Sequence, residues 1–313
     1  MIIMGNSRLR LGELEQRKTG CSCKYYARRP HLDAPRQKKL SLPCMRTVAN
    51  GARPERCVSC DRMNIDHHSP TRQRPPVHAH SARRPLMCLT GASKLYDKGS
   101  SAREALRSVN LEIHKGELIA IAGPRGSGKS ALMKMLGLLE APTSGGYHFL
   151  GVPEQSLSEE QRLWFRRRFF GFVPQAFNML QTTSLQGNVA LPLIYRGLSA
   201  ECCQTAAMRA LSVVGLEDCG HRMPAELDST QQGKAAIARA LVCNPSVLLV
   251  DAARQASEKP LCPEIETLLR KLNTEHELTV VVVTQSDSAA RWAGRVIQVN
   301  GGAVEHDTSG LLH

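Results

Sequence analysis

Long hydrophobic runs and internal repeats are both absent from this chain of 313 residues. Its most apolar stretches, VLLV and LTVVVV, are far shorter than the roughly 18 apolar residues that a membrane-spanning helix requires. No apolar stretch long enough for a secretion signal follows the basic start. The sequence therefore predicts no membrane span, so that a transport role would require a separate membrane subunit.

Cysteines are present but lack the spacing of a disulfide framework. Those after residue 86 are predicted to be reduced packing or surface residues, because disulfides are rare in cytosolic proteins. They are Cys88, Cys202, Cys203, Cys219, Cys243 and Cys262. Cys57 and Cys60 have the spacing of half a zinc site, but no second pair lies at a usual distance. The other candidate ligands near them are Cys21, Cys23, Cys44, His67, His68, His78 and His80.

Acidic residues are scarce in the first 86 residues, which hold 18 Lys and Arg against 6 Asp and Glu. This segment therefore carries a net charge of +12, out of +13 for the whole chain. Its apolar residues follow no helical or alternating period, and they bury too little surface to offset the entropy of ordering. We predict a disordered basic extension, which can attract nucleic acid or anionic lipid only weakly and without specificity.

The octapeptide GPRGSGKS at 123–130 fills every fixed position of the phosphate-binding pattern GxxxxGK[ST]. It follows the apolar run 118–121 and precedes ALMKMLGLL, a strand and helix context that a chance Gly-rich turn would lack. Successive N–H groups of such a loop point at one anion, as does the positive end of the following helix. Lys129 is expected to reach the outer phosphates, and Ser130 to ligate Mg²⁺. The predicted phosphate-binding residues are Gly123, Pro124, Arg125, Gly126, Ser127, Gly128, Lys129 and Ser130.

Further motifs lie on both sides of this loop. They are SKLYDKG with Tyr96, PTSGGYHFLG, FGFVPQAFNML with Gln175, NVALPLIYRGLS, GKAAIARALVCNPSVLLVD ending at Asp251, and VVVVT ending at Thr284. Through these motifs the chain resembles, from about Leu89 to Val304, the ATP-binding subunits of ABC transporters. The segment PLIYRG narrows the resemblance to the branch of macrolide exporters and lipoprotein-releasing complexes.

The resemblance implies roles for three more residues in binding ATP and Mg²⁺. Tyr96 would stack on the adenine, Gln175 would sense the γ-phosphate and the metal, and Asp251 would hold the metal's water. Without the alignment to these family motifs, a lone Tyr is more often a half-buried packing residue, and a lone Gln is more often solvent-facing. Asp251 has independent support, because it ends the apolar strand 247–250, where open α/β sheets bind ligands. The implied metal site comprises Ser130, Gln175 and Asp251.

Three positions depart from the family pattern, and all three fall on catalytic motifs. Ala252 replaces the glutamate that polarises the attacking water, Gln285 replaces the switch histidine, and Asp228 lies in LDSTQ, where the signature LSGGQ is expected. Loss of a positioned base raises the barrier by about 3 to 5 kcal/mol. A carboxylate within about 4 Å of the γ-phosphate opposes closure by about 4 kcal/mol at intermediate dielectric. We expect MgATP binding to survive, fast hydrolysis to be lost, and no intact catalytic set to remain.

The alternation of strand and helix signals predicts an α/β fold, with a P-loop NTPase core, a mostly parallel sheet and an inserted helical subdomain. Apolar runs at about 117–122, 247–250 and 279–284 suit buried parallel strands, and about 153–235 is rich in helix formers. By resemblance, 175–197 is where these subunits grip their membrane partner. The apolar residues of that stretch, which fit an exposed contact and a core position equally well, are Leu191, Pro192, Leu193, Ile194 and Tyr195.

In this family two ATP-binding subunits close head to tail, so that each nucleotide lies between one phosphate loop and the other signature. A homodimer of this chain would lack the base, the histidine and the signature at both sites. In a heterodimer with an intact relative, one site would lack the base and the histidine, and the other would lack the signature. Two functions remain open. One is an energy-coupling subunit of an export complex, held on the cytoplasmic face of the membrane by its permease. The other is a binding-only pseudo-ATPase that regulates or scaffolds a membrane complex.

Met87 begins MCLTGASKLYDKG, which opens directly into the first predicted strand, so we expect residues 1–86 to be a translated leader that the working protein lacks. Deleting them should leave the melting temperature and the MgATP affinity unchanged, because a disordered segment adds no packing to the domain 87–313. Calorimetric melting and titration of both forms measure this. A melting temperature several degrees lower after truncation would show that the segment packs on the domain.

Overall fold

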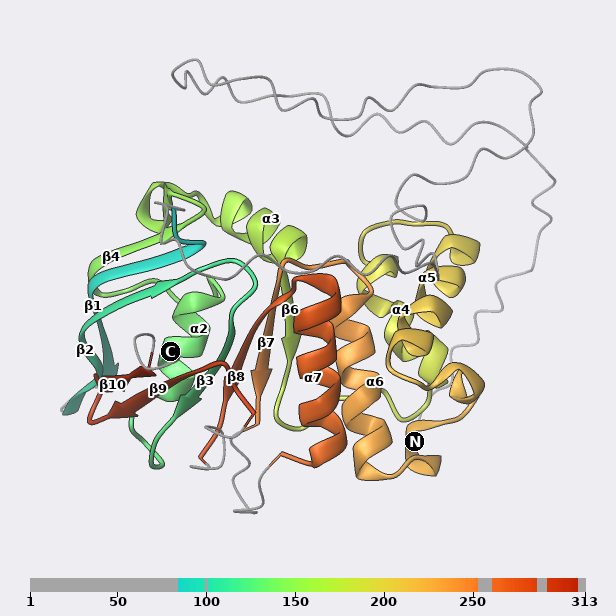
Figure 1. Ribbon diagram of the computed structural model, residues 1–313. Helices are drawn as coiled ribbons and strands as arrows, with labels where there is room; N and C mark the ends of the chain where they lie inside the picture. Colours follow the sequence, from blue (N-terminus) through green and yellow to red (C-terminus); the bar gives the residue numbers. More distant parts are fainter. Residues whose placement is uncertain (1–83, 99–100, 253–260, 286–291, 309–313) are drawn as a thin grey trace, which may run out of the picture. The chain divides into compact units, whose positions relative to one another are not determined.

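The computed structural model describes residues 84–98, 101–252, 261–285 and 292–308 (Figure 1). The basic extension lies outside the described residues up to residue 83, and its candidate zinc ligands lie outside them as well. Within the described part, two β-sheets enclose one helix, and further helices pack on the opposite face of the larger sheet.

The larger sheet has six strands in the order β10-β9-β3-β8-β7-β6. They are β3 (Leu118–Ala122), β6 (Phe170–Val173), β7 (Val247–Asp251), β8 (Thr279–Val283), β9 (Arg295–Asn300) and β10 (Ala303–Asp307). All described pairings are parallel except that of β9 with β10. β3 and β8 are buried at every position, as expected for central strands covered on both faces. The mostly parallel α/β core predicted from the sequence is therefore confirmed.

The smaller sheet is antiparallel, with the strand order β2-β1-β4-β5. Its strands are β1 (Met87–Lys98), β2 (Ser101–Ile113), β4 (Ser144–Phe149) and β5 (Val152–Pro153). Helix α2 (Lys129–Leu136) lies between the two sheets (Figure 1). Its Leu132 and Leu136 share one buried cluster with Leu89 of β1 and Ile121 of β3. This cluster fixes α2, and with it the loop that precedes α2, against both sheets.

The remaining helices are α3 (Glu159–Phe169), α4 (Leu185–Ile194), α5 (Ala200–Val213), α6 (Ser229–Leu241) and α7 (Pro263–His276). A second buried cluster joins the other face of the larger sheet to four of them, with Ile237 of α6 and Leu269 of α7 against Leu248 of β7. Helix α3 instead packs its aromatic side chains on the smaller sheet, where Phe165 meets Phe149 edge to face.

The range 153–235, predicted as a helical subdomain, also contains β6, which pairs in parallel with β7. The compact helical part consists of α4, α5 and α6, which contact one another. Within the apolar stretch that begins at Leu191, Leu193 is buried, whereas Ile194 and Tyr195 are 54% and 79% exposed. Within this stretch, Leu193 is therefore a core residue, whereas Ile194 and Tyr195 are available for an exposed contact.

The core begins one residue before the boundary expected at Met87. The side chain of Leu86 is buried, its N–H donates to the carbonyl of Ile113, and its carbonyl accepts from Leu150, both at 2.8 Å. These bonds continue the pairing of β1 with β2 and β4. A truncation that tests the extension alone should therefore retain this residue.

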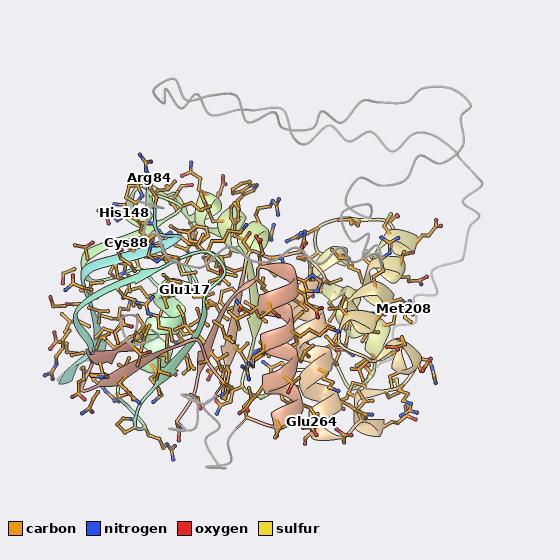
Figure 2. All side chains as sticks on the ribbon, in the orientation of Figure 1. Arg84, Cys88, Glu117, His148, Met208 and Glu264 are labelled. Atoms are coloured by element: carbon orange, nitrogen blue, oxygen red, sulfur yellow. The ribbon has the colours of Figure 1, made fainter. Side chains whose placement is uncertain are left out.

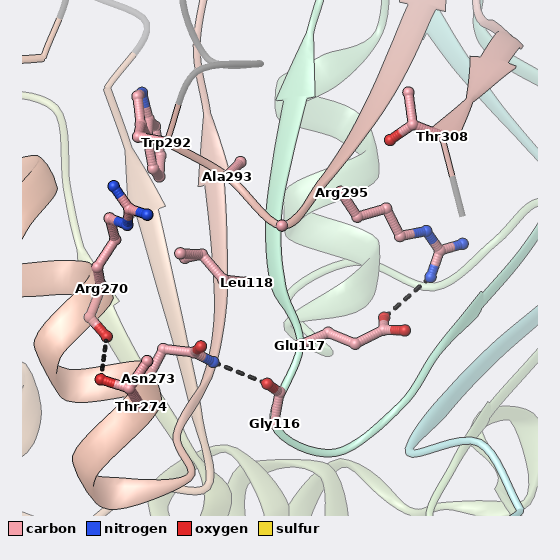
Figure 3. Close-up of a pocket in the computed structure, with 11 residues that line it drawn as sticks. Gly116, Glu117, Leu118, Arg270, Asn273, Thr274, Trp292, Ala293, Arg295 and Thr308 are labelled. Carbon is pink, nitrogen blue, oxygen red and sulfur yellow. Dashed lines mark hydrogen bonds and ion pairs between the residues drawn. The ribbon is translucent and has the colours of Figure 1, made fainter. Parts of the chain in front are cut away.

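Arg295 joins three segments at the amino end of β3. Figure 3 shows its ion pair with Glu117. Its guanidinium forms ion pairs with Glu117 at 2.9 Å and with Asp307 at 2.6 Å. It also donates to the carbonyl of Glu112 at 2.8 Å. The Arg295 side chain is only 10% exposed, so that these charges are largely removed from water.

Replacing Arg295 with Met should lower the free energy of unfolding by about 3 kcal/mol, because Glu117 and Asp307 would lose the guanidinium that neutralises their charges. Urea denaturation measures the loss. Lys115→Ala is the matched control, since the Lys115–Glu277 pair is exposed at both ends and should cost less than about 1 kcal/mol. Equal losses for the two variants would contradict the role assigned to Arg295.

Candidate nucleotide-binding site

The loop 123–130 joins the end of β3 to the start of α2. Gly123 has a φ of 145° and Gly128 a φ of 106°, backbone angles that residues other than glycine rarely adopt. A Cβ atom on Gly123 would lie 2.1 Å from the carbonyl oxygen of Val299, and one on Gly128 would lie 2.3 Å from that of Ala105. The surrounding backbone thus admits only glycine at these two positions, as a phosphate-binding loop requires.

Lys129 is the first residue of α2, and its side chain turns back over the loop. Its Nζ donates to the carbonyl oxygens of Gly123 and Pro124 at 2.7 and 2.5 Å, and to Ser127 Oγ at 3.3 Å. Burial lowers the pKa of Lys129 below its ordinary value, while the negative charge of Asp251 acts in the opposite direction. A desolvated ammonium group is therefore held at the loop, where a phosphate oxygen would be a stronger partner than a carbonyl.

The residues predicted to hold Mg²⁺ lie at the carboxyl edge of the larger sheet. Asp251 ends β7 and, together with Gln175, lines a pocket of about 190 Å³. The negative charge of Asp251 acts to raise the pKa of Lys129, and Ser130 is exposed in the first turn of α2. Hydroxyl, amide and carboxylate oxygens are the hard donors that Mg²⁺ prefers. The donor set present here is therefore compatible with this ion.

Tyr96 lies on β1, directly opposite Arg103 of β2. Its hydroxyl donates to the carboxylate of Glu140, and burial together with this bond raises the pKa of Tyr96 well above its ordinary value. Lys94 Nζ lies 5.5 Å from the centre of its ring. Arg103 in turn donates to the carbonyl of Gly126 at 3.2 Å, which places this part of the smaller sheet beside the phosphate loop. Stacking of Tyr96 on an adenine stays a prediction.

Ala252 directly follows β7, Gln285 follows β8 with Thr284 between them, and both are partly buried. The N–H of Ala252 donates to the carbonyl of Val283 at 2.9 Å, which continues the strand pairing by one residue. A methyl group at 252 can neither accept a proton nor orient a water molecule. The amide of Gln285 has no proton that titrates near neutral pH. Neither side chain can therefore serve as a general base.

Asp228 was expected only to repel the γ-phosphate, but it also has a structural role. Its Oδ1 accepts from the N–H of Gln231 at 2.8 Å, and its own N–H donates to Gln231 Oε1 at 3.2 Å. This reciprocal pair is a capping box at the start of α6. The spacing Asp-x-x-Gln at 228–231 is the signal that could have identified it from the sequence. The carboxylate therefore lies at the positive end of a helix, held by that helix's own backbone.

Comparison with known proteins agrees with this architecture. A family model described as ABC transporter matches residues 106–255. YknY of Bacillus subtilis, named as an uncharacterised ABC transporter ATP-binding protein, is 37% identical to the chain over 72% of its residues and 97% of YknY. The chain belongs to the ABC transporter family. The family and the fold class that the motifs predicted are thus confirmed.

Two further relatives show how much of an ABC transporter the chain represents. The pyoverdine export ATP-binding/permease protein PvdT of Pseudomonas aeruginosa is 37% identical over 226 residues, which are 72% of this chain but only 34% of PvdT. The chain thus spans about a third of that relative. The cassette MJ0796 of Methanocaldococcus jannaschii, solved as a dimer, is 35% identical with a TM-score of 0.62, over 71% of this chain and 97% of MJ0796. In the part of this chain that the structure describes, no helix has the length and hydrophobicity of a membrane span.

Substitution of Lys129 by Ala should weaken MgATP binding at least about tenfold, because the outer phosphates would lose their charged partner. Isothermal titration of the whole chain measures the affinity. Lys271→Ala serves as the control, since Lys271 is exposed on α7 in a pair with Glu275. Equal affinities for the original chain and Lys129→Ala would rule out the loop as the phosphate site.

Proposed function

We propose that this chain is the ATP-binding subunit of an export-type ABC transporter complex and binds MgATP at residues 123–130. The observation that carries the proposal is the glycine loop wedged between Val299 and Ala105, with Lys129 buried against it. Several relatives are named for the export of pyoverdine or macrolides, which supports export as the direction of transport.

Hydrolysis by this site is proposed to be slow. Asp251 remains at the end of β7, but the next residue, Ala252, offers no base, which corresponds to about 3 to 5 kcal/mol of barrier. Gln285 cannot supply the charge of a histidine. In a head-to-tail dimer, Asp228 would bring a carboxylate toward the γ-phosphate bound to the opposite subunit. The defects thus lie both in the chain's own phosphate site and in the surface it offers to a partner's site.

A binding-only pseudo-ATPase is the second candidate, favoured by the combination of Ala252 with Asp228. Such a protein would use MgATP to change shape or assembly rather than to drive repeated cycles. A single-turnover ATPase assay, with nucleotide binding measured in parallel, separates the two candidates. Slow but nucleotide-dependent turnover would support the transporter subunit, and binding without any turnover would support the pseudo-ATPase.

The proposed complex contains a second ATP-binding subunit and a separate permease at the cytoplasmic face of the membrane. A groove of about 440 Å³ beside α4 offers a contact for that permease. Its lining combines apolar Phe172, Leu191 and Tyr195 with Arg167 and Arg196. Tyr195 is the most exposed of the large hydrophobic residues described. Such a mixed apolar and basic groove suits an apolar segment that carries a carboxylate.

Steady-state hydrolysis by the isolated chain should be close to background even at saturating ATP. Ala252→Glu alone should help little, because Asp228 would still oppose closure and Gln285 would still lack a charge. The combined change Ala252→Glu, Gln285→His and LDSTQ→LSGGQ should raise kcat by more than the product of the separate gains, since groups that act as a unit are strongly non-additive. Phosphate release measured on each variant provides the comparison.

The control is Lys129→Ala in the original chain, which identifies any contaminating ATPase. Brisk turnover by the original chain that disappears in Lys129→Ala would refute the slow-hydrolysis proposal. Another residue would then have to act as the base.

A further inference from the structure

Helix α3 presents apolar and basic side chains on one exposed surface. Trp164 is 57% exposed and Leu163 is 37% exposed, and the exposed Arg167 and Arg168 follow one turn later. Residues three and four positions apart share a helix face, so that Trp164 lies beside both arginines. In Figure 2, α3 lies at the upper edge of the view, where side chains project outward. The outer surface of α3 is therefore both apolar and basic.

Aromatic packing holds the indole of Trp164 in this exposed position. Its ring centre lies 5.2 Å from that of Phe165 and 5.9 Å from that of Phe169, both edge to face. Phe165 packs in turn on the buried Phe149. The guanidinium of Arg168 lies 5.6 Å from the centre of the Phe169 ring. The exposed indole is therefore supported from the core through a continuous set of ring contacts.

The end of α4 extends this surface. The guanidinium of Arg196 donates to the main-chain carbonyl of Arg167, which joins the two helices. Ile194 and Tyr195, which are 54% and 79% exposed, directly precede Arg196. Four of the eight large hydrophobic side chains that are exposed in the described part of the chain thus belong to α3 and the end of α4. We define the α3–α4 surface as Leu163, Trp164, Arg167, Arg168, Ile194, Tyr195 and Arg196.

The guanidinium groups of the α3–α4 surface have no acidic partner within the described chain. Among the described residues, none of Arg167, Arg168 and Arg196 takes part in an ion pair. The acids of α3 are Glu159 and Glu160, which lie in its first turn. At 1.5 Å per residue, Glu160 is about 10 Å along the helix axis from Arg167. An anion from outside the chain is therefore the charge that complements this surface.

We propose that the α3–α4 surface binds an anionic lipid surface, with the indole of Trp164 at the boundary between headgroups and acyl chains. Tryptophan favours this boundary because its ring is apolar while its N–H can still donate a hydrogen bond there. Arginine places its apolar stem at the same depth and its guanidinium against lipid phosphates. Leu163 and Trp164 do not line the groove beside α4, so a permease segment bound in that groove would leave them uncovered.

Tryptophan emission of the full chain tests the proposal, because the chain has two tryptophans and the other, Trp292, is buried. Vesicles of equal parts phosphatidylglycerol and phosphatidylcholine should shift the emission to shorter wavelength, and phospholipids brominated in their acyl chains should quench it. Vesicles of phosphatidylcholine alone should do neither at the same lipid concentration. Trp164→Phe, which keeps Trp292, should abolish both signals.

Removal of charge measures the electrostatic part of the contact. Arg167→Gln combined with Arg168→Gln should raise the lipid concentration at half-maximal shift at least about tenfold, since each basic side chain near an anionic membrane favours binding. The matched control is Arg270→Gln combined with Lys271→Gln, which removes two neighbouring exposed charges from α7 and should leave that concentration unchanged. Melting temperatures show whether each variant folds.

Sedimentation of the chain with anionic vesicles without a change in Trp164 emission would overturn the proposal, because the basic extension alone would then account for the binding. Absence of binding would overturn it as well and leave the surface to a protein partner. The contact goes beyond the proposed function and requires no nucleotide, so that Lys129→Ala should keep the shift. A chain that binds MgATP but shows no shift would retain the proposed function and lose the lipid contact.

Discussion

The phosphate loop depends on a tight backbone junction with the turn between β9 and β10. The N–H of Gly302 donates to the carbonyl of Ser127 at 2.9 Å, and its carbonyl accepts from the N–H of Arg107 at 2.8 Å. One glycine thereby joins the loop to β2. The carbonyl oxygens of Val299 and Ala105 lie so close to Gly123 and Gly128 of the loop that no Cβ atom would fit there. The cradle is built from main-chain atoms that belong to both sheets. Side chains at the edge of the site can change without disturbing it, which is why a complete phosphate loop can coexist with Ala252 and Gln285 at the positions expected to be catalytic.

The parts of the molecule that follow local rules could be predicted from the sequence, and those that depend on long-range pairing could not. The glycine spacing predicted the loop, and apolar runs predicted β3, β7 and β8, because buried parallel strands are continuous in hydrophobicity. The smaller antiparallel sheet carries no such signal, since β1 and β2 are long, irregular in register and interrupted by polar residues. Arg103 and Glu140 likewise join the site only through strand pairing and side-chain contact. Asp228 is the exception, because its capping box is local and was readable from the spacing.

Asp228 illustrates how one substitution can serve the fold while changing the site. A helix start binds anions because unpaired N–H groups and the helix dipole both favour negative charge. In α6 this preference is met by the chain's own carboxylate, and the capping box with Gln231 satisfies the first backbone donors. The helix gains a cap of the strongest class. In the proposed head-to-tail dimer, a phosphate bound by the partner would gain nothing from that helix start, because an anion already occupies it.

The burial of Lys129 at the phosphate loop indicates that this fold binds a nucleotide. Its pKa is lowered by burial, which means that the folded state disfavours the charged form. The cost of holding this charge is present in full below the folded pKa and vanishes as the pH rises past the unfolded value. Contacts with loop carbonyls only partly offset the loss of water around an ammonium group. An apolar side chain would pack at this position without that cost, so the ammonium has a physical rationale only if an anion is delivered to it.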